Sequence, residues 1–416
     1  MPEHAPARST AHRPVAPTTA APAGPVPARQ VPALWLALLA TPVAAGANSP
    51  VLILPDMADA FGLRPASVTW LVTAFAWAMA VGTPLMASLL RRCGLRTTLR
   101  VSTVLVLAGT LLVALAPSMA LALPGRAAQA VGGAGLVTSA MSLAGSVRRM
   151  GVITAGFGVL GAVGPLLGSL LADAFSWRVS LAVSVLALTA LPAVTRRAPR
   201  TTPPPATPFD ARGASLLVAL ATALVLLPHH PLPAAGTALA AGAALAAHVR
   251  TRPDGFVPAA LLRTPAFLLA ALPACALATS YFTLLFAVPQ LLAARTDWST
   301  AAIGTGQLVA LLAGSFLSLA LAAVSARLGR RRVLTLLFTL GALAPVTAAV
   351  STWAPLLLLA AAAAVLTTTA GNANLAVYAT QAAPESQRPT VIGLFNLCYQ
   401  LGGAFGPAVA ALLTLS

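Results

Sequence analysis

Residues 68–100 read VTWLVTAFAWAMAVGTPLMASLLRRCGLRTTLR, a run of 23 uncharged residues followed by four arginines within ten positions. A helix needs about 20 apolar residues to cross the hydrocarbon layer, because in lipid each backbone N–H and C=O must be paired within its own segment. The uncharged run therefore predicts a membrane-spanning helix, and the arginines mark its end.

The same pattern repeats along the chain and predicts an all-α polytopic membrane protein. We expect thirteen spans, at about 33–54, 68–89, 98–117, 120–146, 150–172, 177–194, 213–228, 232–249, 266–289, 301–325, 333–350, 354–381 and 390–414.

The arginines predict the orientation, since positive charge is retained on the cytoplasmic side during insertion. With the N-terminus inside, cytoplasmic segments hold 21 arginines, and the opposite gaps hold only Arg64, Arg178 and Arg295. We therefore expect a multi-pass protein of the cell membrane with a cytoplasmic N-terminus. An aromatic belt is expected at the opposite face, from Trp70, Trp177, Trp298 and Trp353.

The net charge of +17 does not predict a nucleic-acid partner, because that needs basic residues gathered on one soluble face. Here the arginines are spread over short loops, where topology and an anionic inner leaflet explain them. The three cysteines are isolated and odd in number, so they predict neither a disulfide framework nor a metal site. We expect the lipid bilayer as a partner and no cofactor.

The chain divides at its proline-rich segments. Residues 1–32 are rich in Pro, Ala and Thr and are expected to be a disordered cytoplasmic tail. Residues 33–195 form a predicted six-helix bundle, and 196–212 form a cytoplasmic linker that proline prevents from being helical. Residues 213–250 are an inserted helix pair. Residues 251–416 are a second bundle in which only five helices are evident.

An internal repeat relates the two bundles. Gly94 lies in Arg91-Arg-Cys-Gly-Leu-Arg96, and Gly329 lies in the similar Ala326-Arg-Leu-Gly-Arg-Arg of the second bundle. Gly161-Ala-Val-Gly-Pro165 recurs as Gly403-Ala-Phe-Gly-Pro407. The two members of each pair are separated by nearly the same number of residues. Nearly equal offsets predict a duplicated six-helix unit with pseudo-twofold symmetry, which is the architecture of transporters whose halves rock about a central site.

These motifs resemble those of the major facilitator superfamily, and within it the fourteen-helix drug:proton antiporter branch. Arg91–Arg96 is similar to the family's helix 2–3 loop motif, and Gly125-Arg-Ala-Ala-Gln-Ala-Val-Gly132 to its helix 4 motif. Gly156–Gly168 is similar to the helix 5 antiporter motif. The loop residues that carry the resemblance are Arg92, Gly94, Arg96, Gly329 and Arg330.

The chain also departs from the family pattern. The aspartate of the loop motif aligns with Arg91 and, in the second copy, with Ala326; the helix 1 aspartate of the branch falls at Gly46. A fourteenth helix would be expected after Ser416, so either the sequence is cut short or this protein ends outside.

Arg126 is the one charge expected within a span. A functional interpretation places it in a central cavity, hydrogen-bonded to Gln129 or to a helix 1 group, because intramembrane charges generally face a bundle interior. The alternative is snorkelling to the outer interface.

All eight acidic residues are expected in tails, loops or helix ends. Proton-driven transport usually relies on a titratable group buried in the membrane, and histidine does not obviously substitute. Proton coupling therefore rests on the resemblance alone.

On helix 5, the small residues Gly161, Gly164 and Gly168 predict close helix packing, and Pro165 predicts a bend. The resemblance implies that this helix seals the cavity. Gly156–Gly161 formally matches a dinucleotide fingerprint, but no strand precedes it. Uncharged polar residues on the helices that line the pathway in the family are candidates for substrate contact, with interhelical hydrogen bonding as the alternative: Asn48, Tyr281, Asn374 and Tyr378.

The resemblance implies a monomeric transporter, not an enzyme, that exports a drug or antibiotic or another small amphipathic molecule by alternating access, in exchange for protons. An uncoupled facilitator, an importer of a small solute and a truncated inactive transporter remain open. A membrane-embedded enzyme would need convergent acids, histidines or a metal cluster, and the sequence suggests none.

Overall fold

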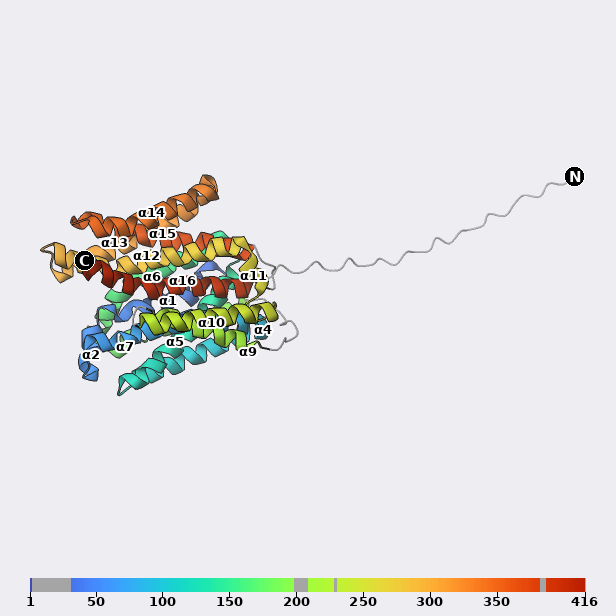
Figure 1. The fold of residues 1–416 in the computed structure, drawn as a ribbon, viewed down its shortest axis with the longest axis horizontal. Coiled ribbons are helices and arrows are strands. Elements are labelled where there is room, and N and C mark those ends of the chain that lie inside the picture. The colour runs from blue at the N-terminus through green and yellow to red at the C-terminus, as the bar shows by residue number, and fades with distance from the viewer. Residues whose placement is uncertain (2–30, 198–208, 228–229, 382–386, 416) are drawn as a thin grey trace.

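The computed structural model describes Met1 and residues 31–197, 209–227, 230–381 and 387–415. This part of the chain is helical, without strands, and its long helices run side by side (Figure 1). The prediction of an all-α polytopic membrane protein is confirmed. Most of the predicted tail and linker lies outside the described residues.

The first half of the chain contains ten helical segments: α1 (Ala33–Asn48), η1 (Ser49–Val51), α2 (Leu54–Phe61), α3 (Pro65–Val68), α4 (Trp70–Ala114), α5 (Met119–Ala144), α6 (Val147–Ala174), α7 (Trp177–Ser180), η2 (Val183–Ala190) and α8 (Leu191–Arg197). Two helices follow the linker: α9 (Ala211–Leu226) and α10 (Pro231–Thr251). The second half contains α11 (Ala259–Arg263), α12 (Pro265–Arg295), α13 (Thr300–Leu328), α14 (Arg330–Val350), α15 (Ala354–Gln381) and α16 (Arg388–Leu415).

Every predicted span corresponds to helical structure in the described chain. Ten helices there are long and apolar enough to cross a membrane, and one of them, α4, covers two of the predicted spans. The α9 helix is apolar but only 16 residues long.

Three details differ from the sequence-based expectation. The first helix ends at Asn48, short of residue 54, and continues as a 3₁₀ turn that contains Pro50, since proline lacks the N–H that an α-helix needs. The predicted span 177–194 is divided among α7, η2 and α8. Trp177 was expected at the lipid interface, but it is 7% exposed and packs edge-on against Phe61, with ring centroids 5.1 Å apart.

The two glycines of the repeated loop motif adopt nearly the same backbone conformation. Gly94 interrupts α4 with φ 78°, and Gly329 separates α13 from α14 with φ 77°. Side chains rarely occupy this region because Cβ clashes with the backbone. The same residue type therefore reverses the chain at corresponding positions of the two halves.

Buried apolar residues are distributed differently at the two ends of the bundle. We call the end that carries Arg92, Arg149, Arg197, Arg327 and Arg388 the arginine-rich end. There, one cluster draws on both halves and on the inserted helices, with members that include Leu39, Val137, Leu245, Phe267 and Phe395.

At the opposite end the buried residues separate by half. One cluster belongs to the first half and includes Ile53, Leu71 and Trp177. Another belongs, apart from Ala162, to the second half and includes Leu284 and Leu357. The described halves are therefore joined chiefly at the arginine-rich end. In Figure 1, α11 lies at that end, whereas α2 and α7 lie at the other.

The inserted helices are packed onto the first half. Trp77 Nε1 on α4 donates a hydrogen bond of 2.8 Å to Thr222 Oγ1 on α9, and α9 also contributes Leu217 to the cluster at the arginine-rich end. Trp77 therefore lies between α4 and α9.

We expect Gly329→Ala to destabilise the protein by about 1–2 kcal/mol, because an L side chain would occupy the left-handed region. Gly236→Ala in α10 is the matched control: neither site has any atom within 4 Å of an added Cβ, but only Gly329 has a positive φ. Since alanine favours a helix interior, the control should be neutral or stabilising by about 0.5–1 kcal/mol. Thermal melting in detergent tests this, and equal melting temperatures for the two variants would contradict it.

Candidate functional site

Arg126 is the centre of a buried polar network in the first half. Its side chain, on α5, is 0% exposed. One guanidinium nitrogen donates 3.0 Å to Gln129 Oε1, and the other terminal nitrogen donates 3.2 Å to the carbonyl oxygen of Gly46 on α1. Both of the contacts expected from the sequence are present. A side chain without exposure cannot snorkel, so that alternative is wrong.

Gln129 extends the network to two further segments. Its Nε2 donates 3.0 Å to Thr110 Oγ1 on α4 and 3.0 Å to the carbonyl oxygen of Leu181, just after α7. The Phe75 ring of α4 lies against the guanidinium, with 4.3 Å from Cζ to the ring centroid, a favourable cation–π distance. The network thus links α1, α4, α5 and the segment after α7.

Close packing of α4 on α5 brings these groups together. A Cβ on Gly109 would lie 2.6 Å from the carbonyl oxygen of Gly125, so the two backbones touch one residue before Arg126. Every described hydrogen-bond acceptor of Arg126 is neutral. Its Nε is buried without a protein partner, so this N–H is among the guanidinium donors left unused.

The predicted helix 5 motif lies on α6 and packs against α1. A Cβ added to Gly164 would lie 2.9 Å from the carbonyl oxygen of Ala45, and a Cβ added to Gly168 would lie 2.2 Å from that of Ser49. Asn48 Nδ2 donates 2.9 Å to the carbonyl oxygen of Gly161. Pro165 lies within α6, between the two close contacts.

The second half has a similar contact between α12 and α16. An added Cβ at Gly402 would lie 2.3 Å from the Cys275 carbonyl oxygen, and at Gly406 it would lie 2.3 Å from Phe282 Cβ. Thr283 Oγ1 donates 3.3 Å to the carbonyl oxygen of Gly406. The number of residues from Asn48 to Thr283 equals the number from Gly94 to Gly329, so Asn48 and Thr283 occupy corresponding positions of the two halves. Each of them bonds to a glycine carbonyl oxygen.

The four candidates for substrate contact have partners within the protein. Asn48 bonds to α6 as described above. Tyr281 is 7% exposed and packs beside Phe282, with ring centroids 4.8 Å apart. Asn374 Nδ2 donates 2.8 Å to Ala370 O on its own helix.

Tyr378 is the fourth candidate, and the structure places it beside a residue of the repeated loop motif. Arg330 Cζ lies 3.3 Å from the centroid of the Tyr378 ring. This cation–π contact fixes the tyrosine near the arginine-rich end. In the first copy of the motif, Arg92 lies over the Phe209 ring, 5.4 Å from its centroid, whereas Arg96 is exposed.

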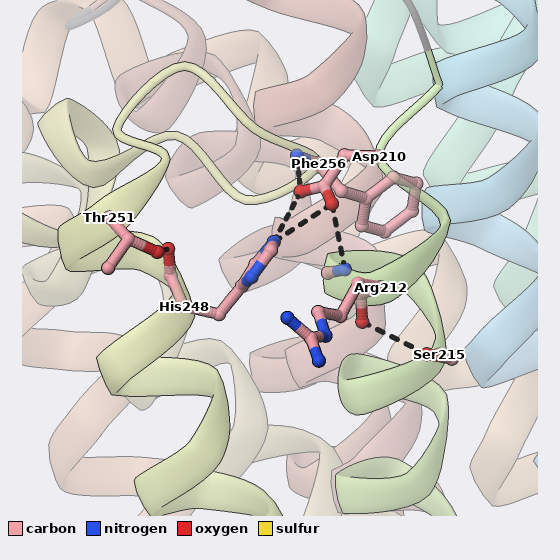
Figure 2. Close-up of polar contacts among 7 residues, drawn as sticks. Asp210, Arg212, Ser215, His248, Thr251 and Phe256 are labelled. Atoms are coloured by element: carbon pink, nitrogen blue, oxygen red, sulfur yellow. Dashed lines mark hydrogen bonds and ion pairs between the residues drawn. The ribbon is translucent and has the colours of Figure 1, made fainter.

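Sequence reasoning missed a buried ion pair at the start of α9 (Figure 2). His248 Nε2 lies 2.8 Å from Asp210 Oδ1 and 3.0 Å from Oδ2. The backbone N–H of Gly213 donates 3.0 Å to Oδ1, and that of Phe256 donates 2.9 Å to Oδ2. Asp210 thus joins α9, α10 and the segment before α11.

The environment of Asp210 favours its charged form. Burial by itself raises its pKa, but hydrogen bonds from Phe256 N–H, Gly213 N–H and His248, with the charge of His248, together lower the pKa below its ordinary value. The only signal in the sequence was local: an aspartate directly before a helix is a common N-cap. Its pairing with His248, at the far end of α10, follows from the α9–α10 hairpin.

We expect Gly168→Ala to cost about 1–3 kcal/mol, the usual penalty for overpacking, because its Cβ would lie 2.2 Å from a backbone oxygen that cannot move independently. Gly151→Ala on the same helix is the control, since its Cβ would make an ordinary 3.6 Å contact with Ala322 Cβ. Melting temperature and monodispersity in detergent provide the measurement. A Gly168→Ala protein as stable as the control would show that α1 and α6 are not held this closely.

Comparison with known proteins agrees with this architecture. The family model described as Major Facilitator Superfamily matches residues 34–407. The uncharacterized MFS-type transporter YvkA of Bacillus subtilis (strain 168) is 30% identical over 212 residues, 48% of this chain and 48% of that protein. The multidrug resistance protein Stp of Mycobacterium tuberculosis (strain CDC 1551 / Oshkosh) is 29% identical over 133 residues, 30% of this chain and 25% of Stp. The alignments thus span about half, or less, of these relatives.

A solved structure shares the fold. The crystal structure of the human organic anion transporter MFSD10 (TETRAN) aligns with a TM-score of 0.63 over 93% of this chain and 94% of that chain. Identity is 19%, so this likeness concerns the fold alone. Because the family model matches from α1 into α16, this multi-pass membrane chain belongs to the Major Facilitator Superfamily.

Proposed function

We propose that this protein exports small amphipathic molecules, such as drugs or antibiotics, by alternating access, with its arginine-rich end in the cytoplasm. The observation that carries the proposal is the division of its core. One buried cluster joins both halves at the arginine-rich end, while the opposite end has a separate cluster in each half. Halves joined at one end can rock apart there and close at the other, as parallel-repeat transporters do.

The contacts between halves at the arginine-rich end are suited to repeated opening. An added Cβ on Gly393 of α16 would lie 2.6 Å from Ala87 Cβ on α4, and Asn396 Nδ2 lies 3.2 Å from Met141 Sδ on α5. These are small apolar surfaces and weak polar contacts.

Export of an amphipathic solute is supported by the surroundings of Arg126 and by the relatives. An apolar pathway with few polar groups holds such a solute by burial of its apolar area. Arg126 is fully covered in this conformation, so its unused donors would meet a solute only once the surrounding helices move. The name of Stp connects a partial relative with multidrug resistance, and that property is carried over here as part of the proposal.

A second candidate function, transport without proton exchange, is favoured by the helix 1 contact. The guanidinium of Arg126 reaches the Gly46 backbone carbonyl, at the position where the antiporter branch has an aspartate. A Cβ there would lie 2.1 Å from Ser184 Oγ and 3.2 Å from Ser184 N, so an aspartate at this position would require the Ser184 side chain to move. Without a titratable partner, Arg126 has no proton to exchange with its neighbours.

We expect Arg126→Gln to slow efflux of the amphipathic dye ethidium from intact cells about tenfold or more, because hydrogen bonds to a charged group contribute about 1.5–3 kcal/mol and each 1.4 kcal/mol is about tenfold. Arg126→Lys, which retains the charge but not the planar fork, should recover part of the rate. The exposed Arg250→Gln variant is the charge-matched control. Normal efflux by a folded Arg126→Gln protein would exclude a role for this residue in transport.

For coupling, we expect substrate movement in proteoliposomes to be the same with and without an imposed pH gradient, and addition of substrate to leave the internal pH unchanged. An entrapped pH-sensitive dye measures the second quantity, with protein-free vesicles as the baseline. Substrate-dependent alkalinisation or acidification that needs the protein would establish proton exchange and overturn the uncoupled candidate, while leaving export itself intact.

A further inference from the structure

A pocket of about 260 Å³ lies at the arginine-rich end, between the first half and the inserted helices. Its walls come from three segments: Ser88, Arg91 and Arg92 of α4, Phe209 and Asp210 at the start of α9, and residues 252–256 before α11. It shares no residue with the Arg126 network, whose α4 members are Phe75 and Thr110. The transport proposal does not use it.

The charges that line this pocket are unbalanced. Three guanidiniums belong to the lining, from Arg91, Arg92 and Arg252, against the carboxylates of Asp210 and Asp254. Both oxygens of Asp210 are already engaged by His248 and by two backbone N–H groups, as Figure 2 shows. The Asp254 side chain is exposed, and it takes no part in the His248–Asp210 ion pair described above. The arginines therefore determine the character of the pocket.

One of these arginines has a buried donor without a partner. The Nε of Arg91 is inaccessible to solvent and has no hydrogen-bond acceptor in the protein. Partly burying a guanidinium without an opposite charge beside it is costly, so an anion beside the rest of the Arg91 side chain in the pocket would relieve that cost. Arg92 is held in place by its stacking on Phe209. Position 91 is also where the similar loop motif has an aspartate, so in this chain an acid is replaced by a third cation.

We propose that this pocket binds a phosphate group, carried by an anionic phospholipid headgroup or by a soluble phosphate. The planar fork of arginine matches the oxygens of phosphate and forms paired, charge-assisted hydrogen bonds with them. The volume is slightly below the range of about 300–1,000 Å³ typical of drug-sized ligands, which suits a headgroup. Basic pockets between helices at the cytoplasmic surface are known to hold anionic headgroups. This site is independent of the proposed export activity.

The bound phosphate would add a contact between the first half and the inserted helices, beside the Trp77–Thr222 bond. Arg91 and Arg92 belong to the first half, and Arg252 ends the inserted pair. An anion held by all three would fasten the inserted helices to α4. Its binding free energy would be added to the stability of the folded protein, because the unfolded chain does not assemble the pocket.

The experiment is thermal melting of the purified full-length protein in uncharged detergent, followed by tryptophan fluorescence. Phosphatidylglycerol, phosphatidylcholine and inorganic phosphate are titrated separately. We expect phosphatidylglycerol to raise the melting temperature. For the Arg91→Gln/Arg252→Gln double variant, the dissociation constant derived from this rise should increase by about tenfold or more, as expected when a charged contact is lost.

A matched double variant, Arg100→Gln/Arg250→Gln, removes the same charge from two exposed arginines outside the pocket and should respond as the wild type does. Arg252→Gln alone, at an exposed position, serves if the pocket double variant does not fold. Native mass spectrometry supplies a second readout: the wild type should retain one more phosphatidylglycerol than the pocket variant.

The three titrations distinguish the sources of the phosphate. A response to phosphatidylglycerol alone identifies a lipid headgroup, and an equal response to inorganic phosphate identifies a soluble phosphate; either result, lost in the pocket variant and kept in the matched control, supports the site. No response of the wild type to either anion overturns the proposal. So does equal weakening in both double variants, which would show that lipid binds to the overall charge of the surface.

Discussion

The close approach of two helices within each half is the constraint on which the rest of the structure depends. Apolar side chains gain little from packing against each other when lipid is the alternative, so membrane helices associate where small residues let their backbones meet. In the first half, Gly164 places α6 against the backbone of α1, and Gly168 places it against the backbone of η1. In the second half, Gly402 and Gly406 place α16 against α12. Once α1 is fixed in this way, the carbonyl oxygen of Gly46 is available to Arg126.

The Arg126 network shows how a charge can be buried in this bundle without an opposite charge. Burial of an ion costs more than a single contact restores, and among the described residues only neutral oxygens accept hydrogen bonds from Arg126. Its stability therefore depends on several partial compensations: two hydrogen bonds, the Phe75 ring and the further bonds that orient Gln129. Such a network depends on packing, because Gly46 is itself pressed against Ser184. Loss of the α1–α6 contact would disturb the arginine as well as the fold.

Features that depend on spacing along the chain could be predicted from the sequence, and features that depend on a neighbour in space could not. Apolar length located the helical spans, and the repeated motif predicted that Gly94 and Gly329 occupy corresponding positions, where the structure shows nearly the same backbone conformation. The expectation for Arg126 offered Gln129 as one of two alternative partners, and that bond is present. By contrast, Trp177 was expected at the lipid surface because sequence does not show that Phe61 covers it. The pairing of Asp210 with His248 was missed because it requires the register of the α9–α10 hairpin.

Two of the three arginines at the arginine-poor end have a structural explanation that also bears on the duplication. Arg178 donates 3.0 Å to the carbonyl oxygen of Ala116, just past the end of α4, and Arg295 donates 3.1 Å to that of Ala348 and also bonds to that of Ser351, at the end of α14. The last carbonyls of a helix lack partners within it and carry partial negative charge, so a guanidinium stabilises them. The number of residues from Ala116 to Ser351 equals the number from Gly94 to Gly329. Ala116 and Ser351 therefore occupy corresponding positions of the two halves. The two halves thus share a helix end that needs a cation, and each supplies it from a different helix, α7 in one and α12 in the other. Both arginines are retained at the arginine-poor end because they cap helices there, a requirement that outweighs the preference of positive charge for the other face.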